Sequence, residues 1–350
     1  MIVGVLVCFL AAGGWEINSS LKPCQSMDIL FKRSGCEQIT PLSGTELLRL
    51  SQDGRILAAY IDLSSMEILD LTSGEIKTIS ESDNGNNTVV AEFDIALTSD
   101  GSYAAVIGST TGEPRLGLVD TTLAQPFLQI IPLPAGQYAT RAAFSPDDKV
   151  LAVAIDAEPD YVAFFHIPDG EQIGRLDFSE DNFVVAYAPG GHLATAMDGR
   201  IQIWDLDGNS IERTIGSQLP AVYSMVFSAD GNLLAVSSGD RFGFGSMAVD
   251  VFRVEDGRGL YKFPARDGSR VADGFPATFS PDGKLLAVAT CEAADVFRIS
   301  DGALVTTFTR YWDNAPFSYG NCLSAVQFTP DGKSVYFGWT DGGVVRWRLP

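Results

Sequence analysis

Residues that could carry out chemistry are few and scattered in this sequence. Its two histidines, His166 and His192, stand outside any HExxH pattern, and no pair of closely spaced cysteines suggests zinc or redox work. It has neither a GxSxG nucleophile elbow nor a glycine-rich loop with phosphate-binding spacing. The 44 Asp and Glu residues could meet in a central funnel, but their number alone indicates no site. The sequence therefore predicts no catalytic residue, no metal and no cofactor.

Aromatic residues gather in two long connections, which we take as the candidate binding site. The candidate partner-binding residues are Tyr311, Trp312, Phe317, Tyr319, Arg241, Phe242 and Phe244. Tyr, Trp, Phe and Arg dominate the hot spots of protein interfaces. A loop as long as the one that holds Trp312 is uncommon unless it is functional. The alternative is that these rings fold back over the strand ends as a small core.

The elements that must position these loops come from a repeat. A turn of the form Ser/Thr-x-Asp-Gly recurs seven times, with 40 to 52 residues between copies. The copies are SQDG (51–54), TSDG (98–101), SPDD (145–148), APGG (188–191), SADG (228–231), SPDG (280–283) and TPDG (329–332). A short apolar strand precedes each turn and a continuous apolar run follows it, such as LLAVAT (285–290). Because such runs lack polar alternation, we expect both faces of that strand to be covered.

A second turn and two more strands complete each copy. In five copies this second turn is Ser-Gly or Asp-Gly, which is the hairpin signal. Asp before Gly suits a backbone with positive φ, so the repeated turn residues are structural. The structural turn residues are Asp53, Gly54, Asp100, Gly101, Asp230, Gly231, Asp282, Gly283, Asp331 and Gly332. Four antiparallel strands in every 40 to 50 residues predict an all-β fold, a seven-bladed β-propeller of four-stranded antiparallel blades.

The seventh copy stops at its third strand, so the outer strand of that blade must come from elsewhere. The segment CEQITPL (36–42) matches the fourth strands of other copies, such as GEQIGRL (170–176). We therefore expect an N-terminal strand at about 36–42 to complete the last blade and close the ring. The predicted domains are a signal peptide at 1–13, a lead-in segment at 14–27 and the propeller at 28–350. Residues 28–35 leave open an extra outer strand or the remnant of an eighth blade.

One stretch makes the resemblance specific. FSPDGKLLAVAT and the following DVFRISDGALVTTF (279–308) resemble a WD-repeat-like propeller blade of the divergent bacterial type, and IQIWDLDG (201–208) carries the Trp-Asp pair at the end of a third strand. The other copies lack that pair, and no Gly-His pair stands upstream of the first strands. Lactonase-type and TolB-like propellers share the SPDG turn and stay open as alternatives. The resemblance implies a platform for protein–protein interactions.

Charge, cysteines and the first residues bear on partners and location. The formal net charge is −20, which argues against nucleic acid and anionic membrane surfaces, because both are bound through Lys and Arg. The uncharged segment 2–14 predicts an exported, extracytoplasmic protein with no integral membrane span. Cys291 and Cys322 fall on the same face in neighbouring copies, which predicts a disulfide bond. The same logic does not favour a bond between Cys24 and Cys36.

Taken together, the sequence predicts a monomeric, non-catalytic platform that binds a protein or peptide partner through its long-loop face. Two other readings remain open. One is a lactonase-like hydrolase with carboxylates at the central funnel, with or without a bound divalent cation. The other is a propeller that binds a small ligand or glycan through the same aromatic residues.

Overall fold

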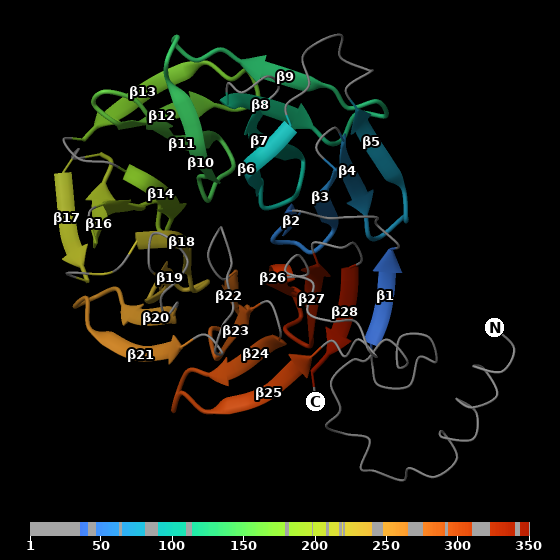
Figure 1. Cartoon of the computed structure of the whole chain (residues 1–350), viewed down its shortest axis with the longest axis vertical. Coiled ribbons are helices and arrows are strands. Elements are labelled where there is room, and N and C mark those ends of the chain that lie inside the picture. Colours follow the sequence, from blue (N-terminus) through green and yellow to red (C-terminus); the bar gives the residue numbers. More distant parts are fainter. Residues whose placement is uncertain are drawn as a thin grey trace, which may run out of the picture.

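The computed structural model describes residues 36–40, 47–62, 65–80, 90–109, 114–178, 182–197, 199–207, 210–216, 219, 221–239, 248–264, 276–290, 293–309, 323–339 and 344–349. All regular secondary structure in these residues is β-strand, and the strands form seven antiparallel sheets of four strands each. The predicted all-β, seven-bladed propeller is confirmed (Figure 1).

Each sheet is one blade, and six of the blades consist of four consecutive strands. Blades one to three consist of β2 (Leu47–Leu50), β3 (Ile56–Asp62), β4 (Ser65–Asp70) and β5 (Ile76–Ser80); β6 (Val90–Leu97), β7 (Tyr103–Ser109), β8 (Pro114–Asp120) and β9 (Leu128–Ile131); and β10 (Tyr138–Phe144), β11 (Val150–Asp156), β12 (Tyr161–His166) and β13 (Gln172–Asp177). Blades four to six consist of β14 (Asn182–Tyr187), β15 (Leu193–Met197), β16 (Arg200–Asp205) and β17 (Ser210–Ile215); β18 (Ala221–Phe227), β19 (Leu233–Gly239), β20 (Ala248–Arg253) and β21 (Gly259–Pro264); and β22 (Ala277–Phe279), β23 (Leu285–Ala289), β24 (Ala293–Arg298) and β25 (Leu304–Thr309).

The seventh blade joins the two ends of the described chain. Its strands are β26 (Leu323–Phe328), β27 (Ser334–Trp339), β28 (Val344–Arg348) and β1 (Cys36–Thr40). β1 pairs antiparallel with β28, with Cys36 opposite Trp347 and Thr40 opposite Val344. In Figure 1 the blue strand β1 lies beside the red strand β28. The prediction that an N-terminal strand closes the ring is confirmed, and the strand ends at Thr40.

The first strand of every blade faces the centre of the ring. Each of these strands contacts the first strand of the next blade, in the closed order β2, β6, β10, β14, β18, β22, β26 and back to β2. As an inner edge strand, each has one side without a hydrogen-bonded neighbour strand. The seven edges together form the wall of a central channel.

The hydrophobic core lies between neighbouring blades. The second strand is covered on both faces, as its continuous apolar run predicts: residues 151–155 of β11 are fully buried. Between blades six and seven, Phe308, Phe337 and Trp347 form an aromatic cluster, in which the Phe308 and Phe337 ring centroids lie 4.7 Å apart. Because every blade packs on two others, the core runs round the ring as a series of blade-to-blade interfaces.

Candidate functional site

The predicted partner-binding residues lie outside the described residues. These are Tyr311, Trp312, Phe317, Tyr319, Arg241, Phe242 and Phe244, and Cys291 and Cys322 lie outside them as well. The segments that contain the aromatic residues connect β25 to β26 and β19 to β20. Since strands in a blade run antiparallel, these connections leave the ring on the face opposite the Ser-x-Asp-Gly turns. We call the two sides the loop face and the turn face.

The turn face is built from one hydrogen-bond pattern that recurs in the blades. In blade six, Ser280 donates its hydroxyl to Asp282 Oδ1 at 2.7 Å and accepts the N–H of Leu285 at 2.9 Å. Asp282 Oδ1 also accepts the N–H of Lys284, and the Gly283 N–H bonds back to the Ser280 carbonyl at 2.8 Å. The glycine has φ +68°. Buried turn groups are thus satisfied locally, which fixes the hairpin between the first and second strands.

These hydrogen bonds shift the pKa of the turn aspartates. The Ser280 hydroxyl, together with the Lys284 N–H and ammonium, lowers the pKa of Asp282 against the opposing effect of burial. The same direction holds in four other turns, and the residues are Asp100, Asp147, Asp230 and Asp331. All five carboxyl groups are therefore held in the charged, hydrogen-bonded form by the turn itself.

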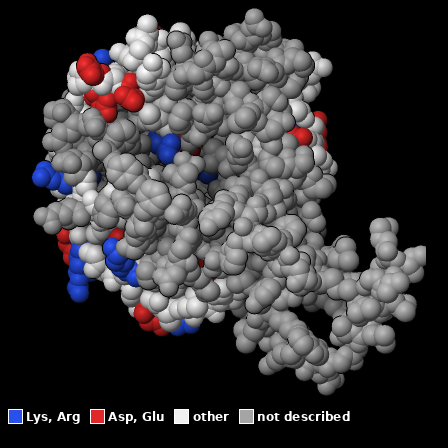
Figure 2. Space-filling model, viewed as in Figure 1, with Lys and Arg blue, Asp and Glu red and all other residues white. Residues whose placement is uncertain are grey.

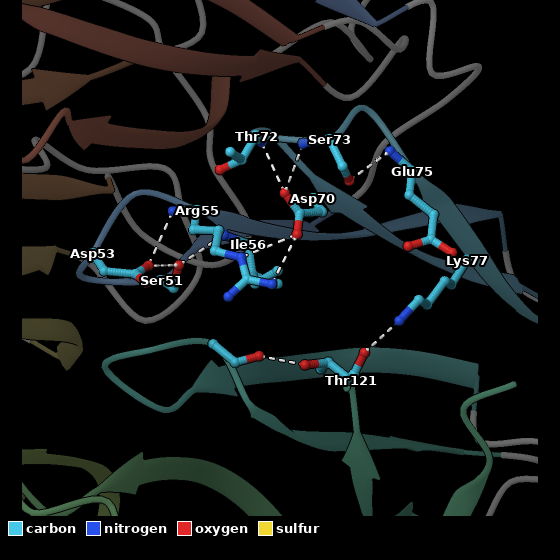
Figure 3. A network of polar contacts seen from close by, with 11 residues as sticks. Ser51, Asp53, Arg55, Ile56, Asp70, Thr72, Ser73, Glu75, Lys77 and Thr121 are labelled. Atoms are coloured by element: carbon cyan, nitrogen blue, oxygen red, sulfur yellow. Dashed lines mark hydrogen bonds and ion pairs between the residues drawn. The ribbon is translucent and has the colours of Figure 1, made fainter. Parts of the chain in front are cut away.

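A polar network joins the two turns of blade one (Figure 3). Arg55 follows the first turn and donates its Nε to Asp70 Oδ2 at 3.0 Å. Asp70 in turn accepts the N–H groups of Thr72 and Ser73. Burial raises the pKa of Asp70, but these two N–H groups and Arg55 outweigh it, and the net pKa is lowered. The network holds the ends of β3, β4 and β5 together at the turn face.

Outer strands reach across to the next blade at the same face. Lys77 Nζ donates to the Thr121 carbonyl at 2.9 Å, as the lower part of Figure 3 shows. Gln129 Nε2 donates to the Asp169 carbonyl at 3.0 Å, and Arg213 donates to the Val254 carbonyl. In each case a long side chain of the fourth strand bonds to the second turn of the following blade. These contacts tie neighbouring blades together near the outer rim.

The first turns of neighbouring blades also contact each other, close to the channel. At the seam between blades seven and one, a Cβ atom at Gly54 would lie 2.5 Å from Pro330 Cδ, so only glycine fits. Between blades six and seven, Pro281 packs on Gly332 less tightly, since a Cβ atom there would lie 3.6 Å from Pro281 Cδ. The second residue of one turn therefore packs on the fourth residue of the next.

Blades two and three replace this contact by hydrogen bonds. Ser99 stands where four of the other turns have Pro, and Asp148 stands where all the other turns have Gly. The Ser99 N–H donates to Asp148 Oδ1 at 2.8 Å, and the Ser99 hydroxyl donates to Asp148 Oδ2. Asp148 has φ +60° and is the one non-glycine residue in the described part of the chain with positive φ. A polar pair thus takes the place of an apolar one.

The channel wall carries a charged cluster on blades one to three. Asp94 on β6 is buried, and its Oδ1 accepts a hydrogen bond from Arg49 Nη2 on β2 at 3.2 Å. Asp94 Oδ2 accepts the N–H of Ala142 on the inner edge of β10 at 3.0 Å. Arg49 and Arg141 each donate Nη1 to a carbonyl of their own strand, those of Leu48 and Thr140 respectively. One carboxylate therefore bridges three blades between two arginines.

This cluster escaped the sequence prediction. Arg49 and Arg141 are each the only charged residue of their strand, and Asp94 shares β6 with Glu92, which resembles ordinary variation when a copy is read alone. Aligned on the turns, however, Asp94 and Arg141 occupy the same position, four residues before the turn. The other five copies have uncharged residues there, Leu47, Val184, Ser224, Pro276 and Ala325. That departure from the repeat is the signal that could have found them.

A metal-dependent active site has no counterpart among the described residues. Nowhere in that part of the chain do three His, Cys, Asp or Glu side chains gather so that they could hold a metal ion. Among the inner-strand side chains that are described, Asp94 is the only carboxylate, and Arg49 and the Ala142 N–H occupy its two oxygens. The carboxylate funnel of a lactonase-like hydrolase gains no support from these residues. In the part of the chain that the structure describes, no helix is long and apolar enough to cross a membrane.

Blade four, which carries the Trp-Asp pair, has a buried side-chain hydrogen bond between its second and third strands. Trp204, at the end of the third strand of blade four, donates Nε1–H to Thr195 Oγ1 at 2.9 Å in a buried environment. Residues 209–242, which follow directly, match the family described as WD domain, G-beta repeat. A WD repeat-containing protein of Schistosoma mansoni, SL1-17, is 33% identical over 120 residues, which cover 33% of this chain and 36% of that protein. The chain is a WD-repeat-like β-propeller.

The match to the Schistosoma protein is partial. The aligned segment spans about a third of each chain. What that protein does as a whole therefore does not pass to this WD-repeat-like propeller. The seven copies of the turn and the common four-stranded order of the blades extend the propeller fold, but not the family match, round the ring.

Proposed function

We propose that this WD-repeat-like propeller is a non-catalytic platform that presents its loop face to a protein or peptide partner. The observation that supports this most is the set of hydrogen bonds and packing contacts that join neighbouring blades on the turn face. Lys77, Gln129 and Arg213 bond to the next blade at the outer rim, and the first turns pack on one another near the channel. Loops on the opposite face are therefore mounted on a rigid base, which lowers the entropy lost on association.

The aromatic connections supply the binding residues in this proposal. Tyr311, Trp312, Phe317 and Tyr319 would be the anchors, with Arg241, Phe242 and Phe244 on a second loop. A disulfide between Cys291 and Cys322 would rigidify the first connection, and counting free thiols before and after reduction tests it. Two free thiols from these residues in the unreduced protein would refute the bond.

Cross-linking in the native extract tests the platform. The intact protein is compared with a variant in which Tyr311, Trp312, Phe317 and Tyr319 are changed to Ser, and captured proteins are identified by mass spectrometry. A matched control changes four exposed apolar residues of the outer rim to Ser. These are Phe127, Ile173, Ile211 and Leu304, which are 45% to 56% exposed.

The expected result is a partner captured by the intact protein and by the rim variant but lost by the loop variant. All three proteins must melt alike for the comparison to hold. If the rim variant loses the partner and the loop variant still captures it, the interface lies on the outer strands. No partner captured by any of the three would remove the support for a platform.

A further inference from the structure

The second turn of blade two departs from the repeat. In five copies this turn is a tight Ser-Gly or Asp-Gly hairpin, whereas in blade two residues 121–127 connect β8 to β9. Two large apolar side chains of this turn are exposed, Leu123 by 37% and Phe127 by 56%. Among the described residues, no other blade has more than one such side chain. The turn thus carries an apolar surface that the hairpin does not require.

The wider turn is fixed at its base. Thr121 is buried, its N–H donates to the Ser102 carbonyl at 3.0 Å, and its hydroxyl donates to the Gly101 carbonyl. Lys77 Nζ of blade one donates to the Thr121 carbonyl, as Figure 3 shows. These bonds hold the turn to blades one and two, so a ligand that contacts it loses little entropy in ordering it.

β9, which follows the turn, is the outer strand of blade two (Figure 1). No described strand pairs with its outer side. Leu128 and Ile130 pack on the interface of blades one and two, and Ile131 lies in that of blades two and three. Gln129 bonds to blade three. Since the side chains of β9 serve contacts between blades, the strand offers its backbone outward, and extended peptides pair with such edges.

Charge sets this edge apart from the others. Natural edge strands are often protected by charged residues, and β1, β5, β13, β17 and β21 each contain Lys, Arg or Glu. Figure 2 shows charged atoms along the left and lower rim, where blades three to six lie. β9 and β25 contain none, but the turn before β25 holds the ion pair of Arg298 and Asp301. Residues 121–140 form the longest stretch of the sequence without a charged residue. Blade two therefore combines an uncharged turn with an uncharged outer strand.

The length of the edge indicates what fits it. Pro126 and Pro132 flank β9 and have no N–H, so strand pairing is confined to about residues 127–131, which span roughly 16 Å. A stable interface between two folded proteins takes about 20 to 30 residues a side. Two copies of this chain would also repel, because each carries a formal net charge of −20. A short, uncharged segment of another protein suits the edge better than a second copy.

We propose that β9 and the turn 121–127 bind an uncharged, extended peptide segment, which adds a fifth strand to blade two. The backbone of the segment pairs with β9, and its apolar side chains contact Phe127 and Leu123. This site lies on the outer rim, away from the loop face. The inference goes beyond the proposed function and does not rest on it.

A labelled peptide tests the edge on the full chain. The probe is fluorescein-labelled Ser-Gly-Val-Thr-Val-Thr-Val-Gly-Ser, and its anisotropy is followed as the protein is added. The control peptide carries N-methyl groups on its three central residues, which keeps the side chains and removes the N–H donors of strand pairing. The variants are Phe127→Asp and Leu123→Asp. Leu304→Asp is the matched control, because Leu304 is 51% exposed on β25, the other uncharged outer strand.

We expect the probe to bind and the N-methylated peptide not to bind. Phe127→Asp weakens binding by about tenfold or more, because it removes the apolar contact and places a charge on the edge. Phe127→Leu stays within about threefold of the intact protein, and Leu304→Asp within about twofold. Amide hydrogen exchange slows in β9 when the probe is bound and does not change in β25.

Four results would overturn the edge site. The first is no binding of the probe to the intact protein, and the second is equal binding of the N-methylated peptide. The third is an equal loss in Leu304→Asp and Phe127→Asp. The fourth is a dimer in sedimentation that Phe127→Asp abolishes, which would assign the edge to a second copy. Melting curves show that each variant is folded, and Leu123→Asp carries the test if Phe127→Asp is not.

The capture experiment keeps this site apart from the platform. Phe127 is one of the four residues changed in the rim variant, so a ligand of the edge is lost from that variant alone, whereas the loop-face partner is lost from the loop variant alone. Probe binding that depends on Phe127, without a loop-face partner, would support the edge site and count against the platform. A loop-face partner without probe binding would do the reverse.

Discussion

The residues that do most for this fold are small and polar. In each Ser-x-Asp-Gly turn a buried hydroxyl bonds to a carboxylate and to a backbone N–H, as Ser280 does with Asp282 and Leu285. Blade four, whose turn reads APGG, lacks both side chains and still forms its hairpin. A single turn is therefore dispensable for topology and contributes to stability instead.

Ser280→Ala should lower the free energy of unfolding by about 1 kcal/mol, because it removes the acceptor of the Leu285 N–H in a buried place. Urea unfolding followed by fluorescence measures this. Ser210→Ala, on an exposed position of β17, is the control and should change little. Equal stabilities of the two variants would contradict the role given to the turn hydroxyl.

The Ser99–Asp148 pair should show strong coupling. Ser99→Pro or Asp148→Gly alone breaks the hydrogen bonds between blades two and three. The double variant recreates the Pro–Gly contact seen between Pro281 and Gly332, so its loss should be smaller than the sum of the single losses by about 1 kcal/mol. A double-mutant cycle in urea measures it. Strict additivity would mean that the two residues do not act as a pair.

At the scale of elements, the strand pair β1–β28 sets the integrity of the ring. β1 adds the fourth strand that the last copy lacks, and Trp347 on β28, packed on Phe308 and Phe337, anchors its partner to blade six. The outer edge of blade seven thus depends on contacts between the two ends of the described chain.

Trp347→Ala should destabilise the protein by about 3–5 kcal/mol, because it removes a large buried ring. Hydrogen exchange should then speed up most in β1 and β28. Trp204→Ala, in the interface of blades three and four, is matched in size and should speed exchange there without reaching β1. Uniform acceleration in both variants would show that the ring opens only as a whole.

Repetition explains how much of this architecture the sequence could predict. Seven copies of one turn fix the number of blades, and the likeness of CEQITPL to GEQIGRL points to the closing strand. The charged channel cluster could not be found in the same way. Arg49, Asp94 and Arg141 belong to three different copies, and they meet only because the ring places β2, β6 and β10 side by side.

At the scale of the whole molecule, carboxylates govern the response to acid. Hydrogen bonds lower the pKa of five first-turn aspartates, and in the second turn of blade five Arg253 and the Arg258 N–H lower the pKa of Asp256 to about 2. A carboxyl whose folded pKa lies below its unfolded value stabilises the fold above the unfolded pKa, which is about 3.9. That contribution is lost as the pH falls through the folded pKa.

These aspartates should therefore leave the melting temperature unchanged above about pH 5. Between about pH 4 and 2 their protonation should lower it steadily. Calorimetric scans at intervals across this range measure it. Asp256→Asn removes one of the titrating groups and should make the fall shallower, whereas Ser210→Ala, which removes no titrating group, should leave it unchanged. A fall that is equally steep in both would contradict the assignment to the turn carboxyl groups.

The pairing of β1 with β28 also orders events in time. The ribosome makes β1 before any other described strand and β28 after all of them, so blade seven cannot be completed before β28 has been made. Until then β1 has no partner strand and the blades already formed keep an open side, which is the state in which strand edges recruit other chains. Ring closure therefore waits for β28, and the edge of β1 stays open to other chains until that strand is in place.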